Sequence, residues 1–220
     1  MKILTVSDVE LSYIYSPTVK ARFGDSDMVI SCGDLPYFYL EYIISSLDVP
    51  LYYVRGNHAS KVEIGSEGER LFPWGGIDLH KRCVRAQNGL LLAGLEGSLR
   101  YNFGPHQYNQ VEMWMLVFSL VPGLIYNRIR YGRYLDIFVA HAPPWKIHDK
   151  DDLPHQGIKA FRWLINVFQP PIFLHGHIHI YRQDAVTETI IQNTCVINSY
   201  GHRVLTINPK SFPIQILGVK

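Results

Sequence analysis

The strongest constraint on the fold is a repeated pattern, in which a short apolar run is followed almost at once by a side chain that can bind a metal. Residues 3–6, 28–32, 51–54 and 136–140 are such runs, and the side chains that follow them are those of Asp8, Asp34, Asn57 and His141. Each run is typical of a buried β-strand. In open α/β sheets ligands gather outside the carboxyl ends of the strands. The sequence therefore predicts that these side chains converge at one edge of a sheet.

A fifth run, residues 171–174, leads into Leu174-His175-Gly176-His177-Ile178-His179. Glycine adopts backbone conformations closed to other residues, so we expect a sharp turn at Gly176. His177 and His179 then lie in an exposed turn. Imidazole is the commonest metal ligand among side chains, and the pair suits two adjacent metal sites. A histidine-rich surface turn is the alternative, and the other strand ends decide between them.

Other segments complete an alternating α/β pattern. Helices are expected over residues 36–47 and 156–168, and strands over 77–85, 90–95, 190–191, 196–197 and 204–207. The chain has no internal repeat, linker or low-complexity tract. We expect a single domain spanning residues 1–220.

Composition excludes several classes of protein. The formal charge is +2, from 21 basic and 19 acidic residues, without a polybasic run, so non-specific nucleic-acid binding is not expected. The three cysteines, Cys32, Cys83 and Cys195, are widely spaced and predict reduced core residues. The N-terminus enters a strand pattern at once and has no secretory signal, so we expect a cytoplasmic location.

Residues 111–126 form an apolar stretch that only Glu112 and Ser119 interrupt. It is shorter than the roughly 20 residues of a membrane span, and Pro122-Gly123 is expected to break or kink a helix. A buried helix is one interpretation. The alternative is a helix that exposes one face, either as the contact of a homo-oligomer or as a groove for an acyl chain.

Four side chains are candidates for contacts with an anionic substrate. Arg55 precedes Gly56 at a strand end, and Arg100 follows the run 90–95. His148 and His155 belong to a polar loop, residues 146–157, after the strand that ends at His141. The alternatives are an arginine whose stem covers apolar surface, for Arg100, and a solvated turn before the next helix, for the loop.

Taken in order, the strand ends resemble the calcineurin-like metallophosphoesterase family over residues 1–179. The five matching blocks are Asp8-Val9-Glu10, Gly33-Asp34, Gly56-Asn57-His58, the lone His141, and Gly176-His177-Ile178-His179. Residues 141–144 and 157–161 are similar to bacterial predicted phosphohydrolases of this family. The resemblance implies a four-layer α-β-β-α sandwich, with two mixed β-sheets flanked by helices and a dinuclear metal centre at the sheet edge.

The resemblance also implies a role for each block. Asp8 and His179 bind one metal, Asp34 bridges both, and Asn57, His141 and His177 bind the other. The activity implied is hydrolysis of a phosphomonoester or phosphodiester by a metal-bridging hydroxide, with His58 assisting the leaving group. Histidine suits acid catalysis because its ordinary pKa of about 6.5 is near neutral pH. The resemblance implies two divalent metal ions, for which we expect Mn²⁺, with Fe, Zn, Co or Mg as alternatives. Mixed oxygen and imidazole ligands favour metals of this group over soft ones.

The chain departs from the family pattern at two positions. Glu10 stands where the family has histidine, and Ala59 stands where an acidic residue often follows. A ligating Glu10 adds a negative charge, so metal is expected to be held more tightly and a phosphoester attracted less. Alternatively, Glu10 points away and the first metal has one ligand fewer.

Two alternatives to this enzyme remain. One is a metal-poor binding scaffold similar to the retromer subunit of this fold, with residues 111–126 as its interface. The retained His58 argues against it, because a scaffold has no need of a leaving-group acid. The other is a lipid-linked pyrophosphate hydrolase, which would use the same apolar stretch as an acyl groove.

Overall fold

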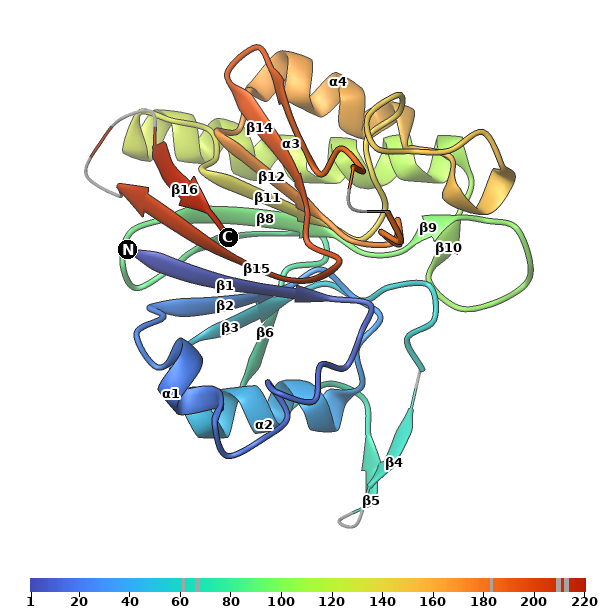
Figure 1. Cartoon of the computed structure of the whole chain (residues 1–220). Coiled ribbons are helices and arrows are strands. Elements are labelled where there is room, and N and C mark those ends of the chain that lie inside the picture. Colours follow the sequence, from blue (N-terminus) through green and yellow to red (C-terminus); the bar gives the residue numbers. More distant parts are fainter. Residues whose placement is uncertain (61, 66–67, 183, 209–210, 212–213) are drawn as a thin grey trace.

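Two six-stranded sheets pack face to face, and helices cover the outer face of each (Figure 1). The computed structural model describes residues 1–60, 62–65, 68–182, 184–208, 211 and 214–220. Both sheets combine parallel and antiparallel neighbours. The predicted four-layer α-β-β-α architecture is therefore confirmed.

The first sheet contains the N-terminal strands. Its order is β16-β15-β1-β2-β3-β6. Strands β1, β2, β3 and β6 run parallel to one another, and β15 is antiparallel to both of its neighbours, β1 and β16. The strands are β1 (Lys2–Ser7), β2 (Met28–Ser31), β3 (Leu51–Tyr53), β6 (Gly76–Asp78), β15 (Gly201–Asn208) and β16 (Gln215–Val219). The carboxyl ends of β1, β2 and β3 thus lie at one edge.

The second sheet has the order β13-β14-β12-β11-β8-β7. Its strands are β7 (Arg82–Arg85), β8 (Leu91–Leu95), β11 (Ile137–Ala140), β12 (Ile172–His175), β13 (Glu188–Ile191) and β14 (Thr194–Asn198). The four central strands are parallel to one another. A core that includes Ile3, Ile30, Val139 and Leu174 fills the space between the two sheets. Strands buried on both faces account for the continuous apolar runs in the sequence.

In the described part of the chain, four α-helices form the outer layers. Helices α1 (Val19–Phe23) and α2 (Tyr37–Leu47) pack on the first sheet, and α3 (Gln110–Tyr131) and α4 (Lys159–Phe168) pack on the second (Figure 1). Smaller elements are the hairpin β4 (Glu63–Gly65) and β5 (Gly68–Arg70), the pair β9 (Ser98–Leu99) and β10 (Gln107–Tyr108), and the 3₁₀ helix η1 (Leu153–His155). The β4–β5 hairpin projects beyond α2.

The prediction of one strand over residues 77–85 was wrong. The segment forms two strands in different sheets, β6 and β7, joined at Leu79–Lys81. Lys81 has a φ of 59°, and Leu79 is fully buried between the layers. The chain crosses here from one sheet to the other. The crossing was missed because a strand has the same sequence pattern in either sheet. The last strand, β16, and the β4–β5 hairpin were not predicted.

The predicted helix at residues 111–126 exists but is longer and less buried than expected. Helix α3 continues through Pro122 to Tyr131, and Pro122 lies on its exposed face. The carbonyl that loses its hydrogen bond to a proline nitrogen therefore faces solvent. One face of α3 packs on the sheet and the other is open, which is the second of the two interpretations. Within the described residues, no helix combines the length and apolar character needed to cross a bilayer.

Candidate metal centre

The predicted ligands come from the carboxyl ends of parallel strands in both sheets. Asp8, Asp34 and Asn57 follow β1, β2 and β3, while His141 and His177 follow β11 and β12. Asp34, Asn57, His141 and His177 meet in direct contact. The convergence that the strand-end pattern predicts is therefore present, and it bridges the two sheets.

His141 stands at the centre of the group. Its Nε2 lies 3.0 Å from Asn57 Oδ1, 3.1 Å from Asp34 Oδ2 and 3.1 Å from His177 Nδ1. The ligand atoms of Asp34, His141 and His177 all lie within 4.8 Å of one another. One ring nitrogen cannot satisfy three neighbours with a single proton. Donor atoms crowded in this way are typical of a site for a cation.

The outer contacts orient each ligand toward this point. His141 Nδ1 donates to the carbonyl of Cys32 at 2.8 Å, and His177 Nε2 donates to the carbonyl of Pro154 at 2.8 Å. These bonds leave His141 Nε2 and His177 Nδ1 for the centre. Asn57 Nδ2 donates to the hydroxyl of Tyr101 at 3.0 Å, so its Oδ1 faces inward.

Charge in the cluster follows from burial and proximity. Burial alone would raise the pKa of Asp34 and lower that of His141. Their mutual attraction prevails and brings the pKa of Asp34 to about 2 and that of His141 to about 9. Burial, and then the charge of His141, lower the pKa of His177 to about 3. The positive charge of protonated His141 thus balances the negative charge of the Asp34 carboxylate, and the imidazole of His177 is neutral.

Unusual backbone conformations hold the ligands. Asp8, Asp34 and His177 have φ angles of 66°, 54° and 67°, in the left-handed region that non-glycine residues rarely adopt. Gly176, where the sequence predicted the sharp turn, instead permits close approach. A Cβ at this position would lie 2.0 Å from Ser7 Oγ and 2.6 Å from Asp8 Oδ2. The turn itself falls on His177, a ligand.

Asp8 and His179 form a second, looser part of the centre. The carboxylate of Asp8 is fully buried and accepts the backbone N–H of His177 at 3.0 Å. Burial raises the pKa of Asp8, although the charge of His141 opposes it. The Nε2 of His179 lies 3.8 Å from Asp8 Oδ1, and its Nδ1 contacts the Tyr181 hydroxyl at 2.9 Å. This pair adjoins the first group and faces solvent through His179.

The residues fit divalent cations best at the inner position. Two imidazole nitrogens, a carboxylate and an amide oxygen are a donor set suited to Mn, Fe, Co or Zn. Asp8 and His179 could complete an outer position next to Asp34. Glu10 is exposed and does not belong to the tight group of donors found among the described residues. Its role as a ligand stays a prediction.

His58 lies at the mouth of the centre. Its backbone N–H donates to Asp34 Oδ1 at 2.8 Å, and its side chain is exposed. A hollow of about 630 Å³ opens here. Its lining residues are Glu10, Asp34, Leu35, Pro36, Phe38, His58, Ala59, Ser60, Val62, Glu63 and Ile64. His58 therefore faces space that a substrate group bound beside Asp34 would enter.

Comparison with known proteins decides the family. The sequence model of the calcineurin-like phosphoesterases matches residues 1–181. The chain belongs to this family. No curated protein matches its sequence. The matched range contains every strand-end block of the candidate metal centre.

Several solved structures are similar to this chain. TT1561 of Thermus thermophilus is 14% identical, with a TM-score of 0.62, over 98% of this chain and 97% of that one. The calcineurin-like phosphoesterase YfkN of Bacillus subtilis is 11% identical with a TM-score of 0.48, covering 100% and 89%. A single mutant of Vps29 from Entamoeba histolytica is 10% identical with a TM-score of 0.46, covering 100% and 98%. At these identities the likeness concerns the fold alone.

The two arginines predicted to contact substrate both form ion pairs within the chain. Arg55 Nη1 lies 2.6 Å from Asp78 Oδ2 and 3.5 Å from Glu96 Oε2. Arg100 pairs with Glu112 at 2.9 Å, beside the start of α3. Neither guanidinium contacts the metal group in this structure. Their part in substrate binding stays a prediction.

His148 and His155 lie closer to the centre. The ring of His155 packs on that of His177 at 5.3 Å between centroids, and its Nδ1 pairs with Asp152. His148 lies in contact with the buried His175, 2.8 Å between Nδ1 and Nε2. Burial lowers the pKa of His148 to about 4. His148 and His179 also line a second hollow, of about 330 Å³.

Sequence reasoning missed two sets of supporting residues. Tyr101, which orients Asn57, lies in a loop without regular structure and carries no sequence signal. Glu96 accepts hydrogen bonds from the Tyr108 hydroxyl at 2.7 Å and from His106 Nδ1 at 3.0 Å, and it also pairs with Arg55. Its position after β8, another strand end, was the signal that could have revealed it.

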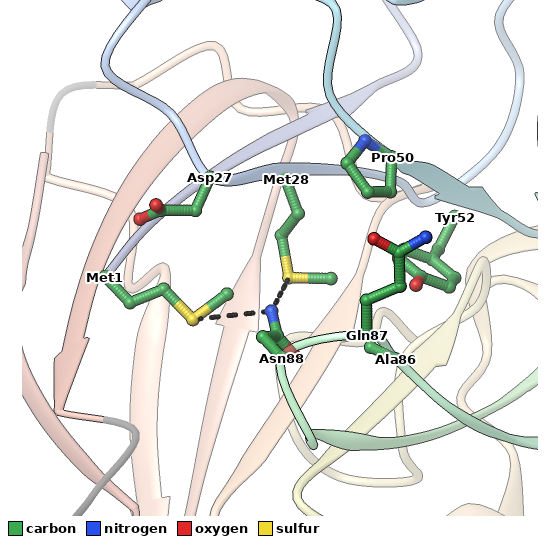
Figure 2. Close-up of a pocket in the computed structure, with 8 residues that line it drawn as sticks. All are labelled: Met1, Asp27, Met28, Pro50, Tyr52, Ala86, Gln87 and Asn88. Atoms are coloured by element: carbon green, nitrogen blue, oxygen red, sulfur yellow. Dashed lines mark hydrogen bonds between the residues drawn. The ribbon is translucent and has the colours of Figure 1, made fainter.

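Another hollow lies at the opposite edge of the first sheet, where its strands begin (Figure 2). It measures about 460 Å³, and Met1, Asp27, Met28, Pro50, Tyr52, Ala86, Gln87 and Asn88 line it. Asn88 Nδ2 lies 3.7 Å from the sulfur of Met1 and 3.9 Å from that of Met28. None of the predicted ligands lines this hollow, so it is separate from the metal centre.

Proposed function

We propose that this chain is a dinuclear-metal-dependent phosphoesterase that hydrolyses a phosphomonoester or a phosphodiester. The observation that carries the proposal is the convergence of Asp34, Asn57 and His177 on the Nε2 of His141. Membership of a family of phosphoesterases supports the reaction class. The substrate itself is left open.

Each ligand has a defined task. Asp34, Asn57, His141 and His177 would hold the inner ion, and Asp8 and His179, with Asp34 between, the outer one. When bound, two divalent ions neutralise phosphate charge and acidify a water molecule. The carbonyls of Cys32 and Pro154 keep the imidazoles in the tautomers that this requires. His141 Nε2 and His177 Nδ1 would thus offer lone pairs to an ion, while the N–H group of each ring donates to a backbone carbonyl.

His58 would donate a proton to the leaving oxygen. Its backbone is tied to Asp34, while its side chain is exposed in the hollow of about 630 Å³. A leaving group bound there would lie among Phe38, Val62 and Ile64, with Glu63 nearby. General acid catalysis contributes roughly 10²- to 10⁴-fold when the leaving group is a poor one.

The two alternatives have less support. Residues of α3 do not line the hollow beside Asp34, so the described structure offers a lipid-linked pyrophosphate no acyl groove there. Metal content and hydrolysis together distinguish the enzyme from a scaffold without catalysis. Mn²⁺ as the natural metal, a cytoplasmic location and a single domain remain predictions from the sequence.

The test combines metal content with hydrolysis. The purified chain is stripped with a chelator, reloaded with Mn²⁺, and assayed with p-nitrophenyl phosphate, bis(p-nitrophenyl) phosphate and a phosphate ester of an aliphatic alcohol. Wild type is expected to bind two ions and to hydrolyse at least one ester. Asp34→Asn is expected to lose both metal and activity. His58→Ala should keep its metal and lose far more activity toward the aliphatic ester than toward p-nitrophenyl esters.

Ser60→Ala is the matched control, because Ser60 is exposed in the same hollow. It should retain metal and activity within about twofold. A wild-type chain that binds no metal and hydrolyses no ester would refute the enzyme and favour the scaffold. Equal loss in His58→Ala with every leaving group would refute only the acid role of His58.

A further inference from the structure

The open face of α3 carries an ordered apolar stripe. Its members are spaced alternately four and three residues apart: Val111, Met115, Phe118, Pro122, Ile125 and Ile129. The five residues other than Pro122 are between 48 and 81% exposed. Alternating spacing of this kind forms the seam of a helix that packs along another helix. The stripe is about 27 Å long at 1.5 Å per residue.

This stripe is not needed to hold α3 in place. The opposite face, with Met113, Val117, Leu120 and Leu124 buried, already packs on the second sheet. The helix has its own capping box, in which Asn109 and Glu112 exchange hydrogen bonds, and it ends at Gly132 in a left-handed conformation. The fold of a single chain therefore does not depend on the stripe.

Beside the first half of the stripe lies a hollow of about 400 Å³. Its lining residues are Lys81, Tyr108, Glu112, Met115, Leu116 and Ser119. Glu112, Ser119 and Tyr126 follow one another at intervals of seven residues, so they share one flank of the stripe. Tyr126 is 60% exposed on the second half of this flank. The same flank thus carries the hollow beside Glu112 and, two heptads further along the helix, the exposed ring of Tyr126.

A two-fold axis brings the two features together. If two α3 helices cross antiparallel with their centres between Phe118 and Pro122, Tyr126 of each copy lies beside Glu112 and Ser119 of the other. We propose that the chain forms a two-fold dimer through α3, in which Tyr126 of each copy fills this hollow of its partner. Its hydroxyl can then donate to the Glu112 carboxylate. An interface of this kind is self-complementary, as two-fold symmetry requires.

The charges on α3 favour the antiparallel arrangement. Arg128 and Arg130 are both at the C-terminal end of the helix and exposed. A parallel pair would bring four guanidinium groups together. The antiparallel pair separates them, because Arg128 and Arg130 of each copy then lie beside the N-terminal half of its partner's helix. A second copy is therefore a better occupant than a membrane surface, which favours a helix rich in Lys and Arg along its polar face, whereas the basic residues of α3 are confined to its last turn.

The proposal is independent of the proposed function. No residue of the stripe or of its hollow lines the hollow beside Asp34, so each copy keeps its own metal centre. Substitutions on α3 should change self-association and leave metal content unchanged.

The test measures mass against concentration for the Mn²⁺-loaded chain, by sedimentation equilibrium. Wild type is expected to be dimeric. Ile125→Lys should weaken the dimer roughly 30-fold or more, and Tyr126→Ala roughly 10-fold. Leu217→Lys on β16 and Ile190→Lys on β13 are matched controls, because both positions are exposed and apolar but lie outside α3. Circular dichroism and metal content verify that each variant is folded.

Cross-linking tests the direction of the helices. Val111→Cys and Ile129→Cys, mixed under oxidising conditions, should form disulfides with each other in preference to themselves. Preferential self-linking of both would overturn the antiparallel dimer. A monomeric wild type, or an Ile125→Lys variant as dimeric as the controls, would overturn the interface. A monomer whose binding to anionic lipid vesicles is abolished by Ile125→Lys would assign the stripe to a membrane and likewise overturn the proposal.

Discussion

The hydroxyl of Tyr101 lies 3.0 Å from the Nδ2 of Asn57 and decides which end of that amide faces the metal centre. An amide nitrogen cannot bind a cation, whereas its oxygen can. We therefore expect Tyr101 to act as a positioning residue, through Asn57.

Removing this hydroxyl should weaken metal binding. In Tyr101→Phe, the amide of Asn57 is free to rotate, and affinity for Mn²⁺ is expected to fall roughly 10- to 100-fold. Titration against a fluorescent chelator measures the change. Tyr131→Phe, at the far end of α3, is the control and should bind as wild type does. Equal affinities in the three proteins would show that Asn57 needs no support.

Gly176 should tolerate no side chain. In Gly176→Ala, the new Cβ meets Ser7 Oγ and Asp8 Oδ2, so the strand end and the Asp8 carboxylate must move apart. We expect a loss of about 1–3 kcal/mol in the free energy of unfolding and a lower metal content. Urea denaturation and elemental analysis measure the two effects. Gly218→Ala, where nothing lies within 4 Å, should be nearly neutral.

Glu96 should make stability depend on pH in the acid range. Burial would raise the pKa of Glu96, but His106, His80 and Tyr108 together bring it down to about 2 from an ordinary 4.5. A depressed carboxyl pKa stabilises the fold above the ordinary value, and this stabilisation is lost as pH falls toward 2.

Glu96→Gln is accordingly expected to lower the free energy of unfolding by about 2 kcal/mol at pH 7. Its difference from wild type should shrink as the pH falls from 4.5 toward 2. Denaturation curves across this range provide the measurement, with the exposed Glu188→Gln as control. A constant difference at all pH values would contradict an electrostatic origin.

Glu10 offers a test of charge near the substrate. Glu10→His removes one negative charge from the mouth of the centre and restores the family residue, so turnover of a phosphoester is expected to rise. Steady-state kinetics and metal analysis should be done together, because a gain in bound metal would produce the same result. Unchanged turnover at unchanged metal content would contradict the charge argument.

The sequence predicted that the side chains at the candidate metal centre converge, because each lies within a few residues of the carboxyl end of a strand. To predict that Asp34, Asn57 and His141 lie together, it was enough to assume that the carboxyl ends of parallel strands meet at one edge of a sheet. Tyr101 could not be found in this way, since an irregular loop brings it to Asn57. The sharp turn was expected at Gly176, but the left-handed φ falls on His177. Gly176 is instead needed for its close approach to Ser7, and a contact between two distant segments leaves no local signal.

Long-range packing also explains the errors in the fold. Residues 77–85 have one apolar pattern but enter two sheets, and no local property marks the point of crossing. The open face of α3, like its buried face, is largely apolar between Val111 and Tyr126. Periodicity alone therefore left two interpretations of residues 111–126, and only the position of the second sheet distinguishes them.

The inner ligands come from two layers: Asp34 and Asn57 belong to the first sheet, and His141 and His177 to the second. An ion bound among them would add a cross-link between segments that the core between the sheets and hydrogen bonds such as His141 Nδ1 to the Cys32 carbonyl already hold together. Occupancy of the centre and docking of the two layers are then linked equilibria. A chelator would therefore lower the free energy of unfolding as well as remove the catalytic ions. Substitutions that loosen the core between the sheets would in turn weaken metal affinity.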